Sequence, residues 1–281
     1  MHYATNNLLV VINVVLILLF TSCQKNIEEP LKPSEFNKEL REQLGDVTRV
    51  AIVNDADHFK ILPNVPPYDT SVYWYVQSLY NQAINPLRID HQSNEANRWD
   101  YDRLWRVTIL DDEKLNAYVI PGGHFYITTG FLKALETEHE LYYVLAFEAS
   151  LMNEKLLLNR LISEYNTSKL EDVSKQKPTE DGTDSQAVAL SLKNLDFNEE
   201  DVLEADFFAA DLICQTSVYD RKGIITILNR LENNPNFKWL ENRYFDNASR
   251  KDLVESVINA DDCGTLKSNG GYQQYILDIL Q

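Results

Sequence analysis

One carboxylate, Glu148, stands in the middle of an apolar helical pattern in the stretch 140–155, ELYYVLAFEASLMNEK. A carboxylate that is buried without a partner is costly. The residue therefore needs either a chemical role or a buried partner. At 100° per residue its side chain shares a direction with the apolar side chains of Leu141, Val144, Leu145, Leu151 and Met152.

The other residues that could do chemistry form no recognisable site by their spacing alone. The five histidines include no pair at metal-ligand spacing, and we expect His124 at the surface or at the edge of a cleft. Cys214 and Cys263 could form a disulfide in an oxidising compartment, but Cys214 fits a core thiol equally well. The sequence holds no Walker, G-x-G-x-x-G or G-x-S-x-G motif, which argues against nucleotide binding and serine hydrolysis.

The stretch NAYVIPGGHFYITTGFLKAL (116–135), followed by HELYYVLAFEASL (139–151), resembles the HtpX-like and CAAX prenyl protease family of zinc metallopeptidases. Members of that family read N-A-x-x-x-P-G-G, a strand, T-x-G-L-L, and then a helix with H-E-x-x-H. The resemblance implies a metallopeptidase fold. It also implies a cleft lined by Asn116, Pro121, Gly122, Gly123, Asp206 and Arg250.

The zinc ligands of the family are replaced in this chain. Aligned on the preceding residues, H-E-x-x-H falls on Phe147-Glu148-Ala149-Ser150-Leu151. Val202 takes the place of the third ligand, the first Glu of E-x-x-A-D, while Asp206 matches the last residue of that motif. The resemblance thus makes Glu148 the counterpart of the general base, without a metal-bound water to activate.

Zinc binding needs electron-pair donors, and the three aligned ligand positions have none. Two histidines one helical turn apart and a third oxygen ligand hold catalytic zinc, with one position open for water. Phe147, Leu151 and Val202 cannot replace them, so we expect no metal. Because a void in a core is destabilising, we expect these three side chains to pack together where the metal would lie.

A weaker resemblance places Arg250 near the same site. YFDNASRKDL (244–253) is similar to the late H-P-x-x-x-x-R segment of the family, with Arg250 on the arginine. We expect Glu148 either to have a raised pKa or to meet a cation such as Arg250.

The N-terminus resembles a bacterial lipoprotein signal. The apolar run LLVVINVVLILLF, residues 8–20, is short for a membrane span and leads directly into TSCQ. The resemblance implies cleavage before Cys23, a lipid on its thiol, and a membrane-anchored protein on the periplasmic or surface side of the bacterial cell envelope. A cleaved export signal and a short uncleaved anchor are the alternatives. We therefore expect a signal peptide at 1–22 and a polar tether at 23–33.

The remaining residues, 34–281, fit one metallopeptidase-like domain, with the resemblance strongest over 100–255 and a polar, mobile loop at 167–186. The pattern predicts an α+β fold that is mainly helical, with a small sheet of about three strands packed on the former zinc helix. The expected strands are 105–110, 116–120 and 124–128, and the expected helices are 33–46, 69–84, 138–165, and about 198–216, 220–232, 249–260 and 272–280.

The charge balance excludes one class of partner. A formal net charge of −17 argues against nucleic acid, whose phosphates require a basic surface. We expect a lipid-anchored, non-catalytic binding or scaffolding module with a peptide or protein partner, received along an edge strand. The alternatives are an active zinc-dependent metalloendopeptidase that acts on envelope proteins, and an envelope lipoprotein whose fold serves structure alone.

Overall fold

The computed structural model describes residues 36–66, 69–92, 105–153, 155–177, 182–233, 250–252, 254–255, 264–266 and 270–280. All of them belong to one compact unit, Lys32–Gln281. The expected signal peptide at 1–22, the tether at 23–33 and the lipid attachment point Cys23 lie outside the described residues.

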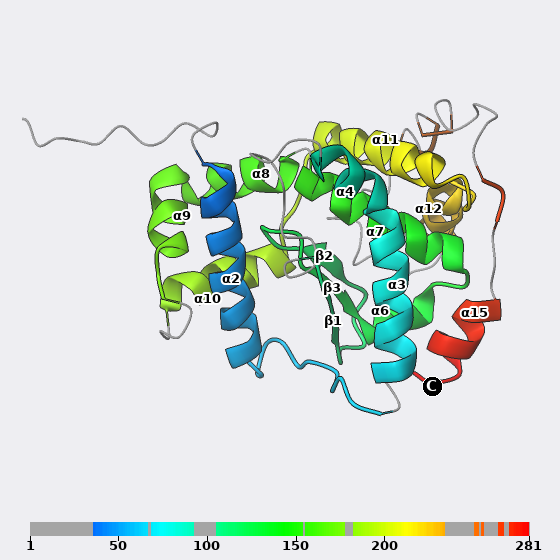
Figure 1. Ribbon diagram of the computed structural model, residues 1–281, viewed down its shortest axis with the longest axis horizontal. Helices are drawn as coiled ribbons and strands as arrows, with labels where there is room; N and C mark the ends of the chain where they lie inside the picture. The colour runs from blue at the N-terminus through cyan, green and yellow to red at the C-terminus, as the bar shows by residue number, and fades with distance from the viewer. Residues whose placement is uncertain are drawn as a thin grey trace, which may run out of the picture. The chain divides into compact units, whose positions relative to one another are not determined.

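A small mixed sheet forms the β part of the fold, as the sequence predicts (Figure 1). Strands β1 (Val107–Leu110), β2 (Ala117–Val119) and β3 (Phe125–Thr128) lie in the order β1-β3-β2. β3 runs parallel to β1 and antiparallel to β2. The turn between β2 and β3 contains two glycines at positive φ, Gly122 and Gly123, a conformation that other residues rarely adopt.

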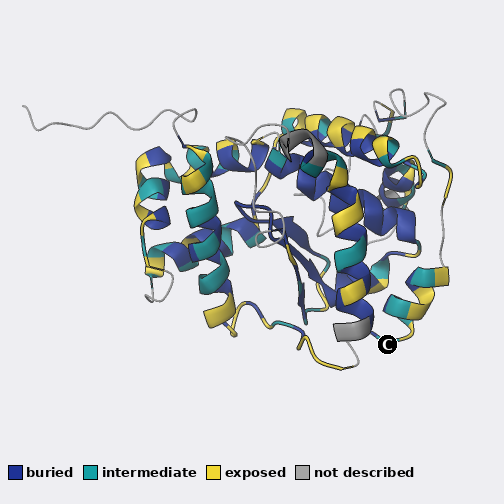
Figure 2. Ribbon diagram, viewed as in Figure 1, coloured by how far each residue is buried: buried dark blue, intermediate teal, exposed yellow. Residues whose placement is uncertain are grey.

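Helix α7 (Glu138–Asn153) is the central element of the helical part. Every residue from Glu138 to Met152 is buried, because α7 packs against β2, α3 (Trp74–Ala83), α11 (Glu199–Thr216) and α12 (Gly223–Asn233). Figure 2 shows α7 and the sheet as the most continuous buried part of the fold. The apolar stripe that the sequence predicts is therefore part of a helix that is covered on all sides.

The long helical segment predicted at 138–165 is two helices. Lys155 has a positive φ of 63°, which breaks the helix between α7 and α8 (Leu156–Tyr165). The first predicted helix, 33–46, is observed as α2 (Lys38–Asn54), where the Asn37 side chain accepts a hydrogen bond from the Leu40 amide.

The prediction of a mobile loop at 167–186 is wrong. Helix α9 (Thr167–Ser174) occupies its first half, and α10 (Thr183–Lys193) begins within its second half. Leu170 and Val173 are fully buried, because they face α2 from one side of a short helix. Two apolar residues at helical spacing are enough to fix this helix, although the stretch is polar overall.

The remaining elements complete a mainly helical α+β domain, which confirms the predicted fold class. In Figure 1, α2, α9 and α10 lie on one side of the sheet, and α3 and α7 lie on the other. The other described elements are η2 (Asp69–Tyr73), α4 (Asn85–Gln92), α6 (Thr129–Ala134), α15 (Gly270–Tyr272) and η5 (Gln273–Leu277).

Candidate functional site

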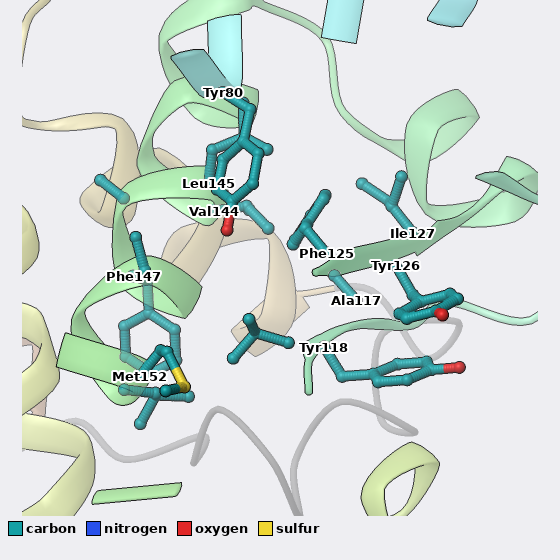
Figure 3. Packing of buried hydrophobic residues seen from close by; sticks show 14 of the residues in the cluster. Tyr80, Ala117, Tyr118, Phe125, Tyr126, Ile127, Val144, Leu145, Phe147 and Met152 are labelled. Atoms are coloured by element: carbon teal, nitrogen blue, oxygen red, sulfur yellow. The ribbon is translucent and has the colours of Figure 1, made fainter. Parts of the chain in front are cut away.

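The three aligned ligand positions lie in the hydrophobic core between α7 and α11. Phe147 and Leu151 are 0 % exposed, and Val202 on α11 is 1 % exposed. All three belong to one cluster of buried apolar residues, and α11 packs along α7. Figure 3 shows Phe147 within this cluster. The centroids of the Phe147 and Tyr143 rings are 6.0 Å apart.

A buried ion pair lies beside these apolar residues. Arg250 Nε and one terminal nitrogen donate to the two carboxylate oxygens of Asp206 at 2.6 and 2.7 Å, and both side chains are 1 % exposed. Tyr143 also donates to Asp206 through its hydroxyl. Burial alone would lower the pKa of Arg250, but attraction to Asp206 and the hydrogen bonds between them raise that pKa above its ordinary value.

Arg250 also lies above the face of Phe147, with its guanidinium carbon 5.5 Å from the ring centroid. A desolvated guanidinium gains from such a contact. The first aligned ligand position therefore packs against a cation.

Glu148 is fully buried on a different side of α7. Its Oε2 accepts a hydrogen bond from the Val119 amide at 3.0 Å, so it faces the edge strand β2. Of the two expectations for Glu148, a raised pKa or contact with a cation such as Arg250, the structure shows that Arg250 is not the cation, because it binds Asp206 on α11. The side chain that matches the family's general base now binds a backbone amide of the sheet.

This hydrogen bond closes the outer edge of β2. Asn116 and Ile120 make the ladder bonds to β3, so by alternation the Val119 amide points away from β3, where an added strand would bind. The residues of β2 are 0 % exposed, backbone included. At the opposite edge, the segment 60–62 binds β1 through Leu62 and Lys60. In the described residues, both edges of the sheet are thus covered.

The expected cleft residues are structural in this fold. Asn116 is 1 % exposed and its side-chain amide donates to the Lys193 carbonyl at the end of α10, at 2.8 Å. A Cβ added to Gly45 of α2 would lie 1.9 Å from the carbonyl oxygen of Pro121, and a Cβ on Gly123 would lie 2.2 Å from the Trp105 ring. These close approaches show that the turn packs against its neighbours and lines no open cleft.

His124 is buried, which corrects the expectation of a surface or cleft-edge residue. Its Nε2 lies 2.8 Å from the Thr108 hydroxyl. Burial, together with the nearby charges of Arg49 and Arg106, lowers the pKa of His124 to about 3. The imidazole is therefore neutral at ordinary pH.

The sequence pattern does not predict two buried tyrosines that contact Glu138. The hydroxyls of Tyr75 and Tyr219 both donate to the Glu138 carboxylate, and burial together with this carboxylate raises the pKa of each tyrosine. The partners are 63 and 81 residues from Glu138 in the chain, so no local spacing marks them.

Cys214 is disulfide-bonded, so the alternative of a core thiol is wrong. The other two cysteines of the chain, Cys23 and Cys263, lie outside the described residues. Gly264 approaches Val218 so closely that an added Cβ would lie 2.2 Å from the Val218 carbonyl carbon. The described segment 264–266 therefore lies against the end of α11.

The side chains of the site do not fit zinc. The three aligned positions offer no electron pair, and Glu148 already accepts a hydrogen bond from Val119. Within the described ranges, no group of three or more His, Cys, Asp or Glu side chains is placed to hold a metal ion. The described side chains can hold the buried Arg250–Asp206 pair and bind β2 to α7 through Glu148. They provide no ligands for a metal ion that would activate a water molecule.

Comparison with known proteins identifies the relationship. The family described as peptidase family M48 matches residues 87–256, which include β1 to β3, α7, α11 and Arg250. No curated protein sequence matches the chain.

Proposed function

The chain belongs to peptidase family M48, and from this we propose that it is a degenerate, HtpX-like member that does not hydrolyse peptides. It serves instead as a binding or scaffolding module. The observation that carries the proposal is the burial of Phe147, Leu151 and Val202 at the aligned ligand positions.

The energetics support a stable fold that needs no metal. Structural zinc contributes about 10–16 kcal/mol in peptide models, so a domain built around the ion would lose much of its stability without it. Here apolar side chains fill the region, and the neighbouring Asp206 is paired with Arg250. A buried apolar cluster and a paired carboxylate are both stable without a bound metal.

The proposal includes anchoring in the bacterial cell envelope, with a lipid on Cys23. Its support is the apolar run 8–20 followed by TSCQ. In the described part of the chain, no helix is both long and apolar enough to cross a bilayer.

Metal analysis of the purified, full-length chain tests the proposal. We expect far less than one equivalent of zinc after dialysis against zinc-containing buffer, and no casein cleavage that a chelator removes. About one zinc per chain together with chelator-sensitive cleavage would overturn the proposal in favour of a zinc-dependent metalloendopeptidase.

The covered sheet edges bear on where a partner binds. Peptide addition to β2 would have to displace the Glu148 side chain from the Val119 amide. We therefore place the binding surface elsewhere on the domain.

A further inference from the structure

A pocket of about 740 Å³ opens between the end of α3, the start of α4 and the end of α11. This volume lies within the range of about 300–1,000 Å³ that is usual for ligand sites. Gln215 in this pocket follows Val202 by 13 residues on α11. It therefore lies about 20 Å along the helix axis from Val202, the third aligned ligand position. The pocket is lined by Asn81, Gln82, Asn85, Pro86, Arg88, Gln215, Thr216 and Val218.

The lining is unusual for so acidic a chain. Four of its eight described residues carry side-chain amides, one carries a hydroxyl and one a guanidinium, and none carries a carboxylate. The whole chain has 43 acidic residues and a net charge of −17. An amide offers donors and an acceptor in one plane without charge, so the pocket suits a neutral ligand rich in hydrogen-bonding groups.

Hydrogen bonds inside the protein orient two of these amides. The Asn81 oxygen accepts from Gln77 at 2.9 Å, which leaves the Asn81 nitrogen to donate to a ligand. The Gln215 nitrogen donates to Asp211 at 2.7 Å, which leaves the Gln215 oxygen to accept. A donor on α3 thus stands across the pocket from an acceptor on α11.

The same lining disfavours a peptide. Peptides are usually received by a strand edge, an apolar helix groove, an aromatic groove for polyproline or a cluster of arginines. The described lining comes from helix ends, holds no aromatic residue and has one arginine, Arg88. Sugar hydroxyls, each both donor and acceptor, match alternating amide groups better.

We propose that this pocket binds a neutral oligosaccharide through the side-chain amides of Asn81, Gln82 and Gln215. The site lies at the opposite end of α11 from Val202 and does not depend on whether the chain binds zinc. It deepens the proposed binding function, since it names a ligand class and a surface for it.

Calorimetric titration of the full chain with the hexamer of N-acetylglucosamine, in the presence of a chelator, tests the site. The test variant is Gln82→Met/Gln215→Met, which keeps side-chain size but removes two amides from opposite walls. The matched control is Gln273→Met/Gln274→Met, because Gln273 is also exposed and donates to an aspartate, Asp278, in the same way.

We expect saturable binding at one site per chain, loss of affinity of about tenfold or more in the test variant, and unchanged affinity in the control. Equal thermal midpoints will show that both variants fold. No saturable binding, an equal loss in both variants, or equally tight binding of a six-residue alanine peptide that competes with the sugar would each overturn the proposal. Because the chelator is present throughout, none of these results depends on the zinc measurement.

Discussion

Two buried polar regions of the domain handle charge in opposite ways. Between α7 and α11, Arg250 and Asp206 form a bidentate ion pair. On the face of the sheet that carries Tyr118 and Tyr126, stacked with centroids 5.0 Å apart (Figure 3), the histidine His124 is neutral. A carboxylate partner lets a buried cation keep its charge, whereas burial near the cations Arg49 and Arg106 removes it.

Each region leaves some buried polar atoms without a hydrogen bond, but only the first contains an ion pair. Asp206 accepts from Arg250 and Tyr143. In the described part of the structure, Arg250 Nη1, His124 Nδ1 and the Tyr126 hydroxyl have no hydrogen-bond partner. Removal of one partner of the ion pair should therefore lower the free energy of unfolding more than replacement of His124. A buried charge that has lost its partner is more destabilising than a change at a neutral ring.

Removal of the carboxylate at Asp206 should give the largest effect. In Asp206→Ala, Arg250 remains buried without its partner, and we expect the free energy of unfolding to fall by about 3–5 kcal/mol. Urea denaturation of both proteins measures the change. The matched control is Asp211→Ala on the exposed side of α11, where a change within about 0.5 kcal/mol is expected. A loss at Asp206 no greater than at Asp211 would show that the pair contributes nothing to stability.

Restoration of the aligned ligands tests whether the region next to Arg250 retains the geometry of a metal site. In Phe147→His/Leu151→His/Val202→Glu, zinc should bind, and at a concentration of about 1,000 Kd it should stabilise the variant by about 4 kcal/mol. Thermal unfolding with zinc and with chelator measures the difference, and the unchanged chain, which should show none, is the control. If the variant folds but zinc does not change its thermal unfolding, the alignment of these three positions is wrong.

The neutral region predicts a dependence of stability on pH. Unfolded His124 binds a proton near pH 6.5, but the folded protein binds it only near pH 3, so the unfolded state holds more protons between these values. Stability should therefore fall as the pH drops below about 6.5, and by pH 5 the loss from this residue should reach about 2 kcal/mol.

The variant His124→Gln isolates this contribution, because glutamine does not titrate but can still bond to Thr108. Urea denaturation at pH 7 and pH 5 should show a drop that is about 2 kcal/mol smaller in the variant than in the unchanged chain. Identical drops would show that His124 titrates normally and that its environment is less desolvated than its burial indicates.

The sequence predicts the elements with strong local signals and misses those that depend on distant partners. The alternating strands around the Pro121-Gly122-Gly123 turn and the burial of Phe147, Leu151 and Val202 follow from local pattern and from the family resemblance. The helix α9 is missed because its stretch is polar and only two apolar residues bury it. Partners across the fold have no signature in sequence spacing, which is why Arg250 is only one candidate partner for Glu148 in the sequence analysis, although it binds Asp206.

The contact between Glu148 and Val119 tests what this carboxylate does in the fold. In Glu148→Ala the buried Val119 amide loses its acceptor, and we expect a loss of about 1–3 kcal/mol together with faster hydrogen exchange at that amide. In Glu148→Gln an acceptor oxygen remains, so the Val119 amide should stay protected although the charge is gone. Equal exchange rates in the two variants would show that the carboxylate does not hold the strand. Protection in the glutamine variant alone would mean that a residue aligned with a general base acts here through hydrogen-bond acceptance, for which no metal and no proton transfer are needed.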